Sequence, residues 1–126
     1  MILGKVEGVG HEWHGHVTAI TVAPEYRRLH LGKNMMDLLE RISDQVYHGF
    51  FVDLYVRLSN DKAIGMYERL GYSIYRRVRK YYGSAGPGNI EDEDAYDMRK
   101  ALPRDVDRRS VRLNGKNIFV NANEVS

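Results

Sequence analysis

The strongest constraint on the fold is the run Phe-Phe-Val-Asp-Leu-Tyr-Val at residues 50–56, in which Asp53 is the one charged residue. A strand with one face in water alternates apolar and polar residues, whereas a strand covered on both faces carries a nearly continuous apolar run. The run therefore predicts a central parallel strand with both faces covered. A chain of 126 residues has room for one such domain and little more.

The segment before this run is typical of a strand, a turn and a helix. Residues 13–23 are rich in β-branched and aromatic residues and are followed by Pro24, which predicts a strand closed by a turn. An apolar stripe at helical spacing then predicts a helix of about four turns. The stripe consists of Leu31, Met35, Leu38, Leu39, Ile42 and Val46.

The segment after the run continues the alternation. Ser59 and Asn60 are N-cap residues for a second helix of about three turns, and Gly71 suits its C-terminal end. Residues 72–82 and 95–100 predict two further strands on either side of an acidic, glycine-containing loop. The order is that of an α/β fold.

The C-terminal residues differ in composition from the rest. We expect a folded domain over residues 1–102 and a polar C-terminal tail over residues 103–126, most simply a mobile one. The pair Asn114-Gly115 is a turn signal, and it leaves a short hairpin over residues 111–120 open as an alternative.

Composition excludes several classes of function. Nineteen Lys and Arg against seventeen Asp and Glu give a net charge of +2, which makes neither nucleic acid nor an anionic membrane the default partner. No apolar stretch approaches the roughly 18 residues of a membrane span. The absence of cysteine excludes disulfides and a cysteine nucleophile, and it fits a reducing compartment, so we expect a cytoplasmic protein.

The most informative segment is residues 23–33, where a strand end and a helix start flank a turn with two arginines. Backbone N–H groups and the positive end of the helix dipole suit a pyrophosphate, and Arg27, Arg28 and Lys33 add charge. The alternative is an ordinary basic turn with exposed arginines, and spacing alone does not separate the two.

This segment resembles motif A of the GCN5-related N-acetyltransferases (GNAT), whose pattern is Arg or Gln, two residues, Gly, one residue, then Gly or Ala. Arg27 and Gly32 match its ends, whereas His30 replaces the first glycine. Further blocks resemble, more narrowly, the catalytic subunits of NatB-type N-terminal acetyltransferases, and the resemblance spans roughly residues 1–110. These blocks are WHGHVTA at 13–19, FFVDL at 50–54, VRLSN at 56–60, MYERLGY at 66–72 and DEDAYDMRKAL at 92–102.

The resemblance implies a GNAT fold, a mixed central sheet with flanking helices, here lacking the first strand and the first two helices of the family. It implies transfer of acetyl from acetyl-CoA to protein N-termini that begin Met-Asp, Met-Glu, Met-Asn or Met-Gln. The partners it implies are nascent polypeptides, a large helical auxiliary subunit and, through that subunit, the ribosome. Because the chain is expected to be shortened at its N-terminus, the alternative is a non-catalytic fragment that binds CoA or a partner without turnover.

The resemblance also assigns the acetyl-CoA site. Tyr67 matches the tyrosine beside the CoA sulfur and is the expected general acid, although its spacing alone favours an amphipathic core residue between Ile64 and Leu70. Asn60 is expected to cap its helix and to contact CoA. The expected cofactor-binding residues are Ile20, Val22, Arg27, Arg28, Leu29, His30, Leu31, Gly32, Lys33, Asn60 and Tyr67.

For the peptide substrate the resemblance implies His16, Thr18, Tyr81 and Tyr82. His14 and His16 lie two apart, so both project from one face of a regular strand, a spacing compatible with a metal site. The sequence shows no third ligand of suitable type near them, and we expect no metal.

A binding module is the alternative from another functional class. The run Arg-Arg-Val-Arg-Lys at residues 76–80, with nearby tyrosines, is compatible with RNA binding, but such a run is more often a solvated strand face. We therefore expect no direct contact with nucleic acid.

Overall fold

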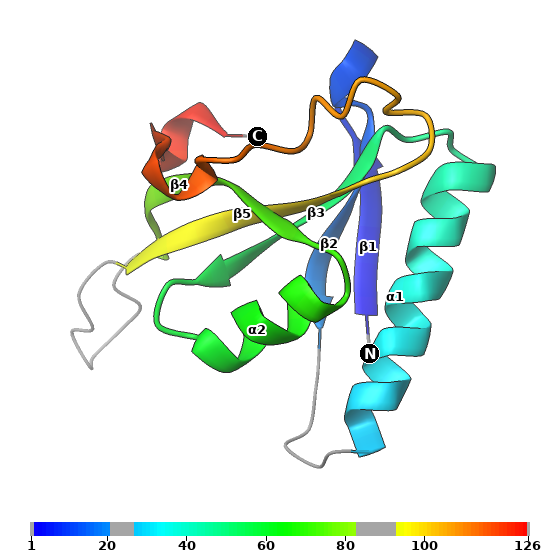
Figure 1. Ribbon diagram of the computed structural model, residues 1–126, viewed down its shortest axis with the longest axis horizontal. Coiled ribbons are helices and arrows are strands. Elements are labelled where there is room, and N and C mark those ends of the chain that lie inside the picture. The colour runs from blue at the N-terminus through cyan, green and yellow to red at the C-terminus, as the bar shows by residue number, and fades with distance from the viewer. Residues whose placement is uncertain (1, 21–26, 83–92, 126) are drawn as a thin grey trace. The chain divides into compact units, whose positions relative to one another are not determined.

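The computed structural model describes residues 2–20, 27–82 and 93–125, with side chains for residues 5–17, 33–81 and 93–125. The chain forms two compact units. The first comprises Met1–Leu54 with Lys100–Ser110, and the second comprises Tyr55–Arg99 with Val111–Ser126. Two strands, β3 (Phe51–Arg57) and β5 (Glu93–Ala101), have residues in both units. Both strands are labelled in Figure 1.

The first unit is built on three strands in the order β1-β2-β3. Strands β1 (Ile2–Glu7) and β2 (His14–Ile20) are antiparallel and are joined through a short 3-10 turn, η1 (Gly10–Glu12). Strand β2 pairs in parallel with β3, with His14 opposite Phe51 and Val17 opposite Leu54. The parallel pairing predicted for the apolar run is confirmed.

The burial of β3 also agrees with the sequence. Phe51, Val52, Asp53 and Leu54 are each at most 2% exposed, so both faces of this part of the strand are covered. An ionisable residue at that depth needs polar partners, because burial without them costs several kcal/mol. Asp53 has such partners, and they belong to the candidate site.

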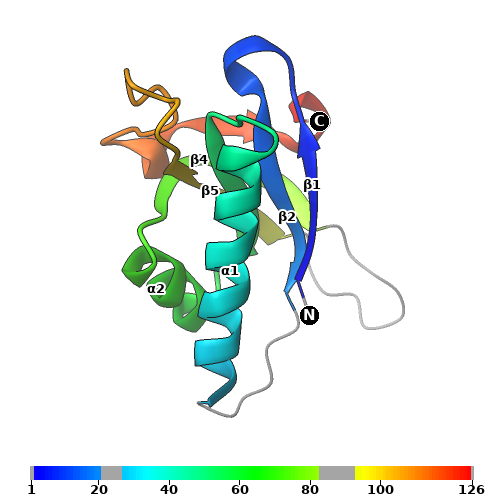
Figure 2. The same ribbon diagram turned by 90° about the vertical axis from the view of Figure 1, so that its right-hand side faces the viewer.

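Helix α1 (Arg27–Gln45) packs beside β1 and β2 in the first unit (Figure 2). The helix is where its apolar stripe predicts it, but much of the stripe does not face the sheet: Leu38, Ile42 and Val46 are 51%, 38% and 63% exposed. Met36 and Ser43, seven residues apart, are buried instead, each 1% exposed. The periodicity of apolar residues therefore predicts the helix. It does not predict which side of the helix faces the sheet, because that depends on where small residues permit close packing.

Gly15 permits that close packing. A Cβ atom at this position would lie 2.2 Å from Ser43 Oγ and 3.1 Å from Ser43 Cβ. Only hydrogen at Gly15 therefore lets α1 lie at this distance from β2.

The second unit has strands in the order β5-β4-β6. Strand β4 (Ser73–Tyr82) is antiparallel to β5 and parallel to β6 (Phe119–Asn121), so each unit contains both kinds of pairing and the expected mixed sheet is confirmed. Helix α2 (Asp61–Arg69) precedes β4 and ends before Gly71, whose φ of +99° fits the glycine expected at a helix C-terminus.

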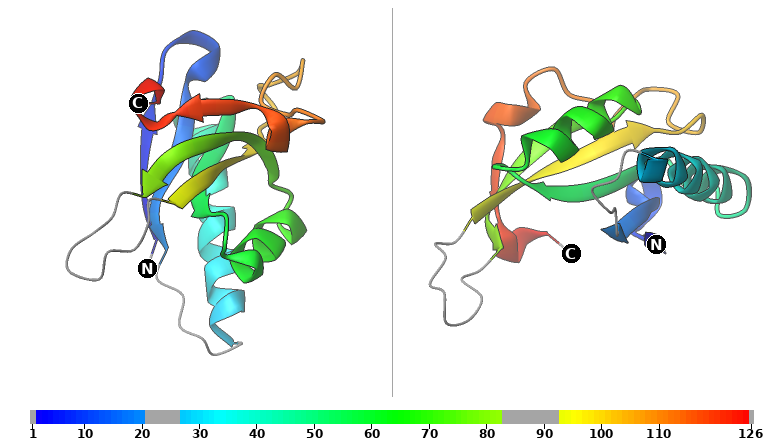
Figure 3. Two further views of the ribbon diagram at one scale, coloured as in Figure 1. Left: turned by 90° about the vertical axis from the view of Figure 1, so that its left-hand side faces the viewer. Right: turned by 90° about the horizontal axis from the view of Figure 1, so that it is seen from below.

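The C-terminal residues pack on β4 instead of forming a hairpin. They comprise η2 (Gly115–Asn117), β6 and η3 (Ala122–Glu124), and Figure 3 shows β6 running beside β4. The Arg77 amide donates to the Ile118 carbonyl at 2.7 Å, and the Phe119 ring lies under the guanidinium groups of Arg77 and Arg79, 5.2 and 4.8 Å from the ring centroid. These contacts replace the local pairing that the Asn114-Gly115 turn signal suggested.

The boundary at residue 102, between a catalytic domain and a tail, stays a prediction. Among the described residues, no helix is both long and apolar enough to cross a membrane.

Candidate functional site

The start of α1 supplies the donors expected for a diphosphate. The helix begins at Arg27, and its first turn contains no acidic residue. The first N–H groups of a helix have no partner within the helix and carry the positive end of its dipole, so this donor set suits the diphosphate of CoA.

Only part of the predicted cofactor-binding turn is described. Val22 lies outside the described residues. The Ile20 backbone ends β2, Lys33 is exposed, and the backbone of Arg27, Arg28, Leu29, His30, Leu31 and Gly32 forms the first turns of α1.

Tyr67 lies in the last turn of α2 and is 8% exposed. Its ring packs edge-on against Tyr72, with centroids 6.1 Å apart, and its carbonyl accepts the Tyr72 amide at 3.0 Å. The buried position expected of a core tyrosine is thus present. The ring is thus packed between its own helix and the residue that precedes β4.

Asn60 is the N-cap of α2. Its side-chain oxygen accepts the Ala63 amide at 3.2 Å, which confirms the cap expected from the sequence.

The peptide-binding candidates have different surroundings. Thr18 belongs to β2, and Tyr82 lies opposite Glu93 in the pairing of β4 and β5. Tyr81 is 36% exposed, and its ring lies 4.6 Å from that of Tyr55. His16 is in a buried cluster.

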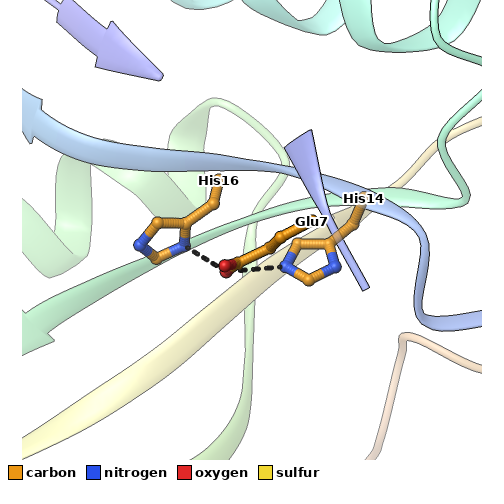
Figure 4. A group of neighbouring side chains, drawn as sticks. All are labelled: Glu7, His14 and His16. Atoms are coloured by element: carbon orange, nitrogen blue, oxygen red, sulfur yellow. Dashed lines mark ion pairs between the residues drawn. The ribbon is translucent and has the colours of Figure 1, made fainter. Parts of the chain in front are cut away.

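The cluster consists of Glu7, His14, His16 and Asp53, all in the first unit. Strand registers bring them together: β1 places Glu7 opposite His14, and β3 places Asp53 opposite His16. The two histidines share one face of β2, as their spacing predicted, and are each 7% exposed. Figure 4 shows the Glu7 carboxylate between the two imidazole rings.

Asp53 is the centre of the cluster's charge. His16 Nδ1 lies 2.6 Å from Asp53 Oδ1, and His14 Nε2 lies 3.3 Å from the same oxygen. Burial of the carboxyl opposes its ionisation, but hydrogen bonds and positive charge from His14 and His16 outweigh burial and hold the pKa of Asp53 far below its ordinary value. An ionised Asp53 can only accept, so His16 Nδ1 donates to it.

The orientation of His14 is fixed from two sides. Its Nδ1 contacts the carbonyl of Glu12, and since a carbonyl only accepts, Nδ1 carries a proton. Its ring stacks on Phe51, with centroids 4.4 Å apart and an interplanar angle of 6°. Nε2 is therefore the ring nitrogen that faces Glu7 and Asp53.

Sequence reasoning missed Glu7 and left Asp53 without a partner. The one signal for Asp53 is its place as the charged residue in an apolar run. Glu7 has no comparable signal, because its role depends on the register of β1 against β2.

Two arginines of the basic run 76–80 are engaged in ion pairs. Arg76 Nε lies 2.8 Å from Asp97, which also pairs with Arg99 at 3.1 Å, and Arg77 Nε lies 2.6 Å from Asp94. These contacts favour a structural role for both arginines over a free phosphate-binding surface.

Comparison with known proteins gives a family match. The model of the acetyltransferase (GNAT) family matches residues 1–72. The catalytic subunit NAA20 of the N-terminal acetyltransferase B complex from Arabidopsis thaliana is 60% identical over 110 residues, which are 87% of this chain and 59% of that protein. The chain thus spans about three fifths of the length of this relative.

Solved structures agree. Chaetomium thermophilum Naa20 in complex with a bisubstrate analogue matches with a TM-score of 0.86 and 42% identity, covering 97% of this chain and 69% of that one. A NatB acetyltransferase complex bound to a bisubstrate inhibitor matches with a TM-score of 0.77 and 39% identity, covering 99% and 68%. The fold inferred from the sequence motifs is confirmed.

Proposed function

Because this chain belongs to the acetyltransferase (GNAT) family, we propose that it transfers acetyl from acetyl-CoA to the α-amino group of proteins that begin Met-Asp, Met-Glu, Met-Asn or Met-Gln. The observation that carries the proposal is the match of nearly the whole chain to a Naa20 structure that holds a bisubstrate analogue. The finer points of substrate choice rest on the residues considered next.

Acetyl-CoA supplies an acetyl group activated as a thioester. We assign its diphosphate to the N–H groups at the start of α1, with Arg27, Arg28 and Lys33 supplying positive charge and Ile20 and Val22 flanking the pantetheine. Leu29, His30, Leu31 and Gly32 complete this turn, and Asn60 and Tyr67 are the other proposed CoA contacts.

The acceptor amine needs little help from the protein. An α-amino group has an ordinary pKa of about 7.7–8.0, so a useful fraction is neutral near pH 7. A base linked through water is sufficient to take the proton that leaves after attack on the acetyl carbon.

Tyr67 is the proposed acid. Full proton transfer from a tyrosine, with a pKa near 10, to a thiol near 8.5 is uphill by about 2 kcal/mol. The hydroxyl group therefore acts mainly by donating a hydrogen bond to the departing sulfur, an interaction that strengthens as negative charge develops there.

We propose that His16 recognises the side chain of the second substrate residue. Its Nδ1 is occupied by Asp53 at 2.6 Å, so the protonated ring has Nε2–H available as a donor. Carboxylate and amide oxygens both accept such a bond, which accounts for one preference shared by Asp, Glu, Asn and Gln. Thr18, Tyr81 and Tyr82 are proposed as further walls of the peptide groove.

The proposed setting is the cytoplasm, with a large helical auxiliary subunit that brings the catalytic chain to nascent polypeptides at the ribosome. The similarity to a chain of a NatB complex supports the subunit. The proposed association with the ribosome rests on the family resemblance.

A non-catalytic role is the second candidate. In that case the chain binds acetyl-CoA or a partner without turnover.

The test is calorimetric binding of acetyl-CoA, followed by turnover of Met-Asp, Met-Glu, Met-Asn and Met-Gln peptides with and without the auxiliary subunit. A peptide beginning Ser-Ala is the matched control. Binding with turnover of the four Met peptides supports the enzyme, binding without turnover supports the second candidate, and absence of both contradicts the proposal.

A further inference from the structure

The cluster of Glu7, His14, His16 and Asp53 has a property that acetyl transfer does not require. The ligand atoms of Glu7, His14 and His16 lie within 4.8 Å of one another, and Asp53 Oδ1 lies beside the nitrogens of both histidines. Hydrogen bonding to a substrate uses one histidine, so it leaves the convergence of four groups unexplained.

The spacing of these atoms is close to that of a tetrahedral metal centre. Ligands bound to zinc at 2.0–2.2 Å lie about 3.3–3.5 Å from one another. His14 Nε2 is 3.5 Å from Glu7 Oε1 and 3.3 Å from Asp53 Oδ1, and His16 Nδ1 is 4.0 Å from Glu7 Oε1 and 2.6 Å from Asp53 Oδ1. Two of these four contacts already have the tetrahedral spacing, and the other two, at 4.0 and 2.6 Å, differ from it by about 0.5–0.9 Å.

We propose that Glu7, His14, His16 and Asp53 form a binding site for one divalent transition metal ion, with zinc as the preferred ion. Two nitrogen and two carboxylate oxygen ligands suit zinc in chemical type and in number. The two negative charges of the carboxylates balance the charge of the ion.

The surroundings hold the ligands as a metal site requires. The Glu12 carbonyl accepts from His14 Nδ1, which leaves Nε2 as the coordinating nitrogen, and the Phe51 ring fixes the imidazole plane. His14, His16 and Asp53 are at most 7% exposed, whereas the Glu7 side chain is 21% exposed. Glu7 therefore lies on the side from which an ion enters.

Protons balance in the binding step. His16 Nδ1 donates to Asp53 in the metal-free cluster, so this proton leaves when Nδ1 coordinates the ion. A neutral ring takes up a proton at Nε2 in exchange, and a protonated ring releases its Nδ1 proton to solvent. His14 Nε2, which also donates to Asp53 when it carries a proton, releases that proton to solvent. The carboxylate of Asp53 turns from accepting hydrogen bonds to coordinating the ion.

The consequence for activity rests on the proposed function. In the metal-free neutral ring the His16 proton is on Nδ1, whereas an ion at Nδ1 leaves the proton on Nε2, the atom proposed to donate to the peptide. Zinc is then expected to lower KM for the peptide and to leave acetyl-CoA binding unchanged.

The test uses Co²⁺ as a spectroscopic probe and Zn²⁺ as its competitor, on the full chain. We expect one equivalent of Co²⁺ with the visible absorption of a tetrahedral site, displaced by one equivalent of Zn²⁺. Glu7→Gln and His14→Ala are expected to weaken binding at least tenfold. His48→Asn, which removes an exposed imidazole outside the cluster, is the matched control and retains full affinity.

Circular dichroism separates loss of the site from loss of the fold, and the conservative Glu7→Gln keeps the test decisive if His14→Ala unfolds. Absence of a tetrahedral Co²⁺ spectrum, or equal affinity in wild type and Glu7→Gln, overturns the site. Acetyl transfer to the peptide is measured in a separate assay. Metal binding without acetyl transfer leaves the site standing and counts against the proposed function, whereas Glu7→Gln that keeps activity and loses the effect of zinc on KM supports both.

Discussion

The Tyr67 hydroxyl group is the atom on which the proposed chemistry depends most. Tyr67→Phe removes this group and keeps the ring that packs on Tyr72, with centroids 6.1 Å apart. We expect kcat to fall about 10²-fold, the low end for a general acid, because the hydrogen bond to the departing sulfur is lost. Acetyl-CoA affinity should change by less than about threefold, since the interaction forms mainly in the transition state. Steady-state kinetics and calorimetry measure the two quantities, and an unchanged kcat excludes Tyr67 as the acid.

Residue types and local spacing predicted several site features. They placed His14 and His16 on one strand face and Asn60 at a helix cap, because both properties depend on near neighbours in sequence. The partnership of His16 with Asp53, 37 residues away, was not predictable. It depends on the register between β2 and β3, which local patterns do not determine.

The docking of α1 on β2 is an element-scale feature with a single-residue test. Gly15→Ala places a Cβ atom 2.2 Å from Ser43 Oγ, so the helix or the Ser43 side chain must move. We expect the free energy of unfolding to fall by about 1–3 kcal/mol, the usual cost of overpacking. Urea denaturation followed by circular dichroism measures the change.

Ser43→Ala supplies the control for this contact. Among the described residues Ser43 Oγ has no hydrogen-bond partner, so removing it alone should cost no stability. In the double variant the new methyl group gains room, and most of the loss should be recovered. Strictly additive changes would show that Gly15 and Ser43 do not meet.

Helix α2 depends on its N-cap. Asn60→Ala removes the acceptor of the Ala63 amide, which lies 3.2 Å away, and should lower the free energy of unfolding by about 0.5–2 kcal/mol. Asn60→Asp keeps an acceptor and places a negative charge at the positive end of the helix dipole, so this variant should remain near wild-type stability. Thermal unfolding of both variants checks this, and equal destabilisation by Ala and Asp counts against the cap.

Elements with a strong local period were predictable, and elements that depend on distant partners were not. The apolar run predicted β3 as a strand at the correct residues, and the N-cap residue and the glycine predicted both ends of helix α2. Strand β6 has three residues, and its pairing with β4 is set by contacts such as Phe119 with Arg77 and Arg79. Such contacts leave no periodic signal.

At the scale of the whole molecule, buried and paired carboxylates predict acid sensitivity. Burial opposes the ionisation of Asp94 and Asp105, yet hydrogen bonds from Lys80 and Arg77 lower the pKa of Asp94, and those from Ser110 and Arg109 lower the pKa of Asp105. A pKa lowered by folding stabilises the protein above the unfolded value, here 3.8, and that stability is lost as pH falls through the folded value. The free energy of unfolding should be level near neutrality and fall below about pH 4.

Asp105→Asn tests the source of this sensitivity. The variant should lose stability at neutral pH and show a shallower decline in acid than wild type, by urea denaturation at each pH. Asp107→Asn is the matched control, because the Asp107 side chain is 71% exposed and its ion pair with Arg109 is long, at 3.9 Å. An acid decline of Asp105→Asn that matches that of wild type contradicts the assignment.

Motif order across the whole chain predicted the fold class and family, because the alternation of elements and the GNAT blocks extend over most of its length. The division at residue 102 had only composition behind it. In the folded chain, residues 103–110 belong to the first unit and residues 111–125 to the second. Polar composition does not distinguish a solvated tail from a segment that packs by backbone hydrogen bonds and cation–π contacts.

The most direct test of the proposed function is the position of the transferred acetyl group. The chain, together with its auxiliary subunit, is incubated with acetyl-CoA and a Met-Asp peptide that also contains an internal lysine, and fragment masses locate the acetyl group. We expect acetylation of the α-amino group alone, and none when that group is blocked. Acetyl on the lysine, or no acetylated peptide despite acetyl-CoA binding, would contradict the proposal that this chain modifies protein N-termini.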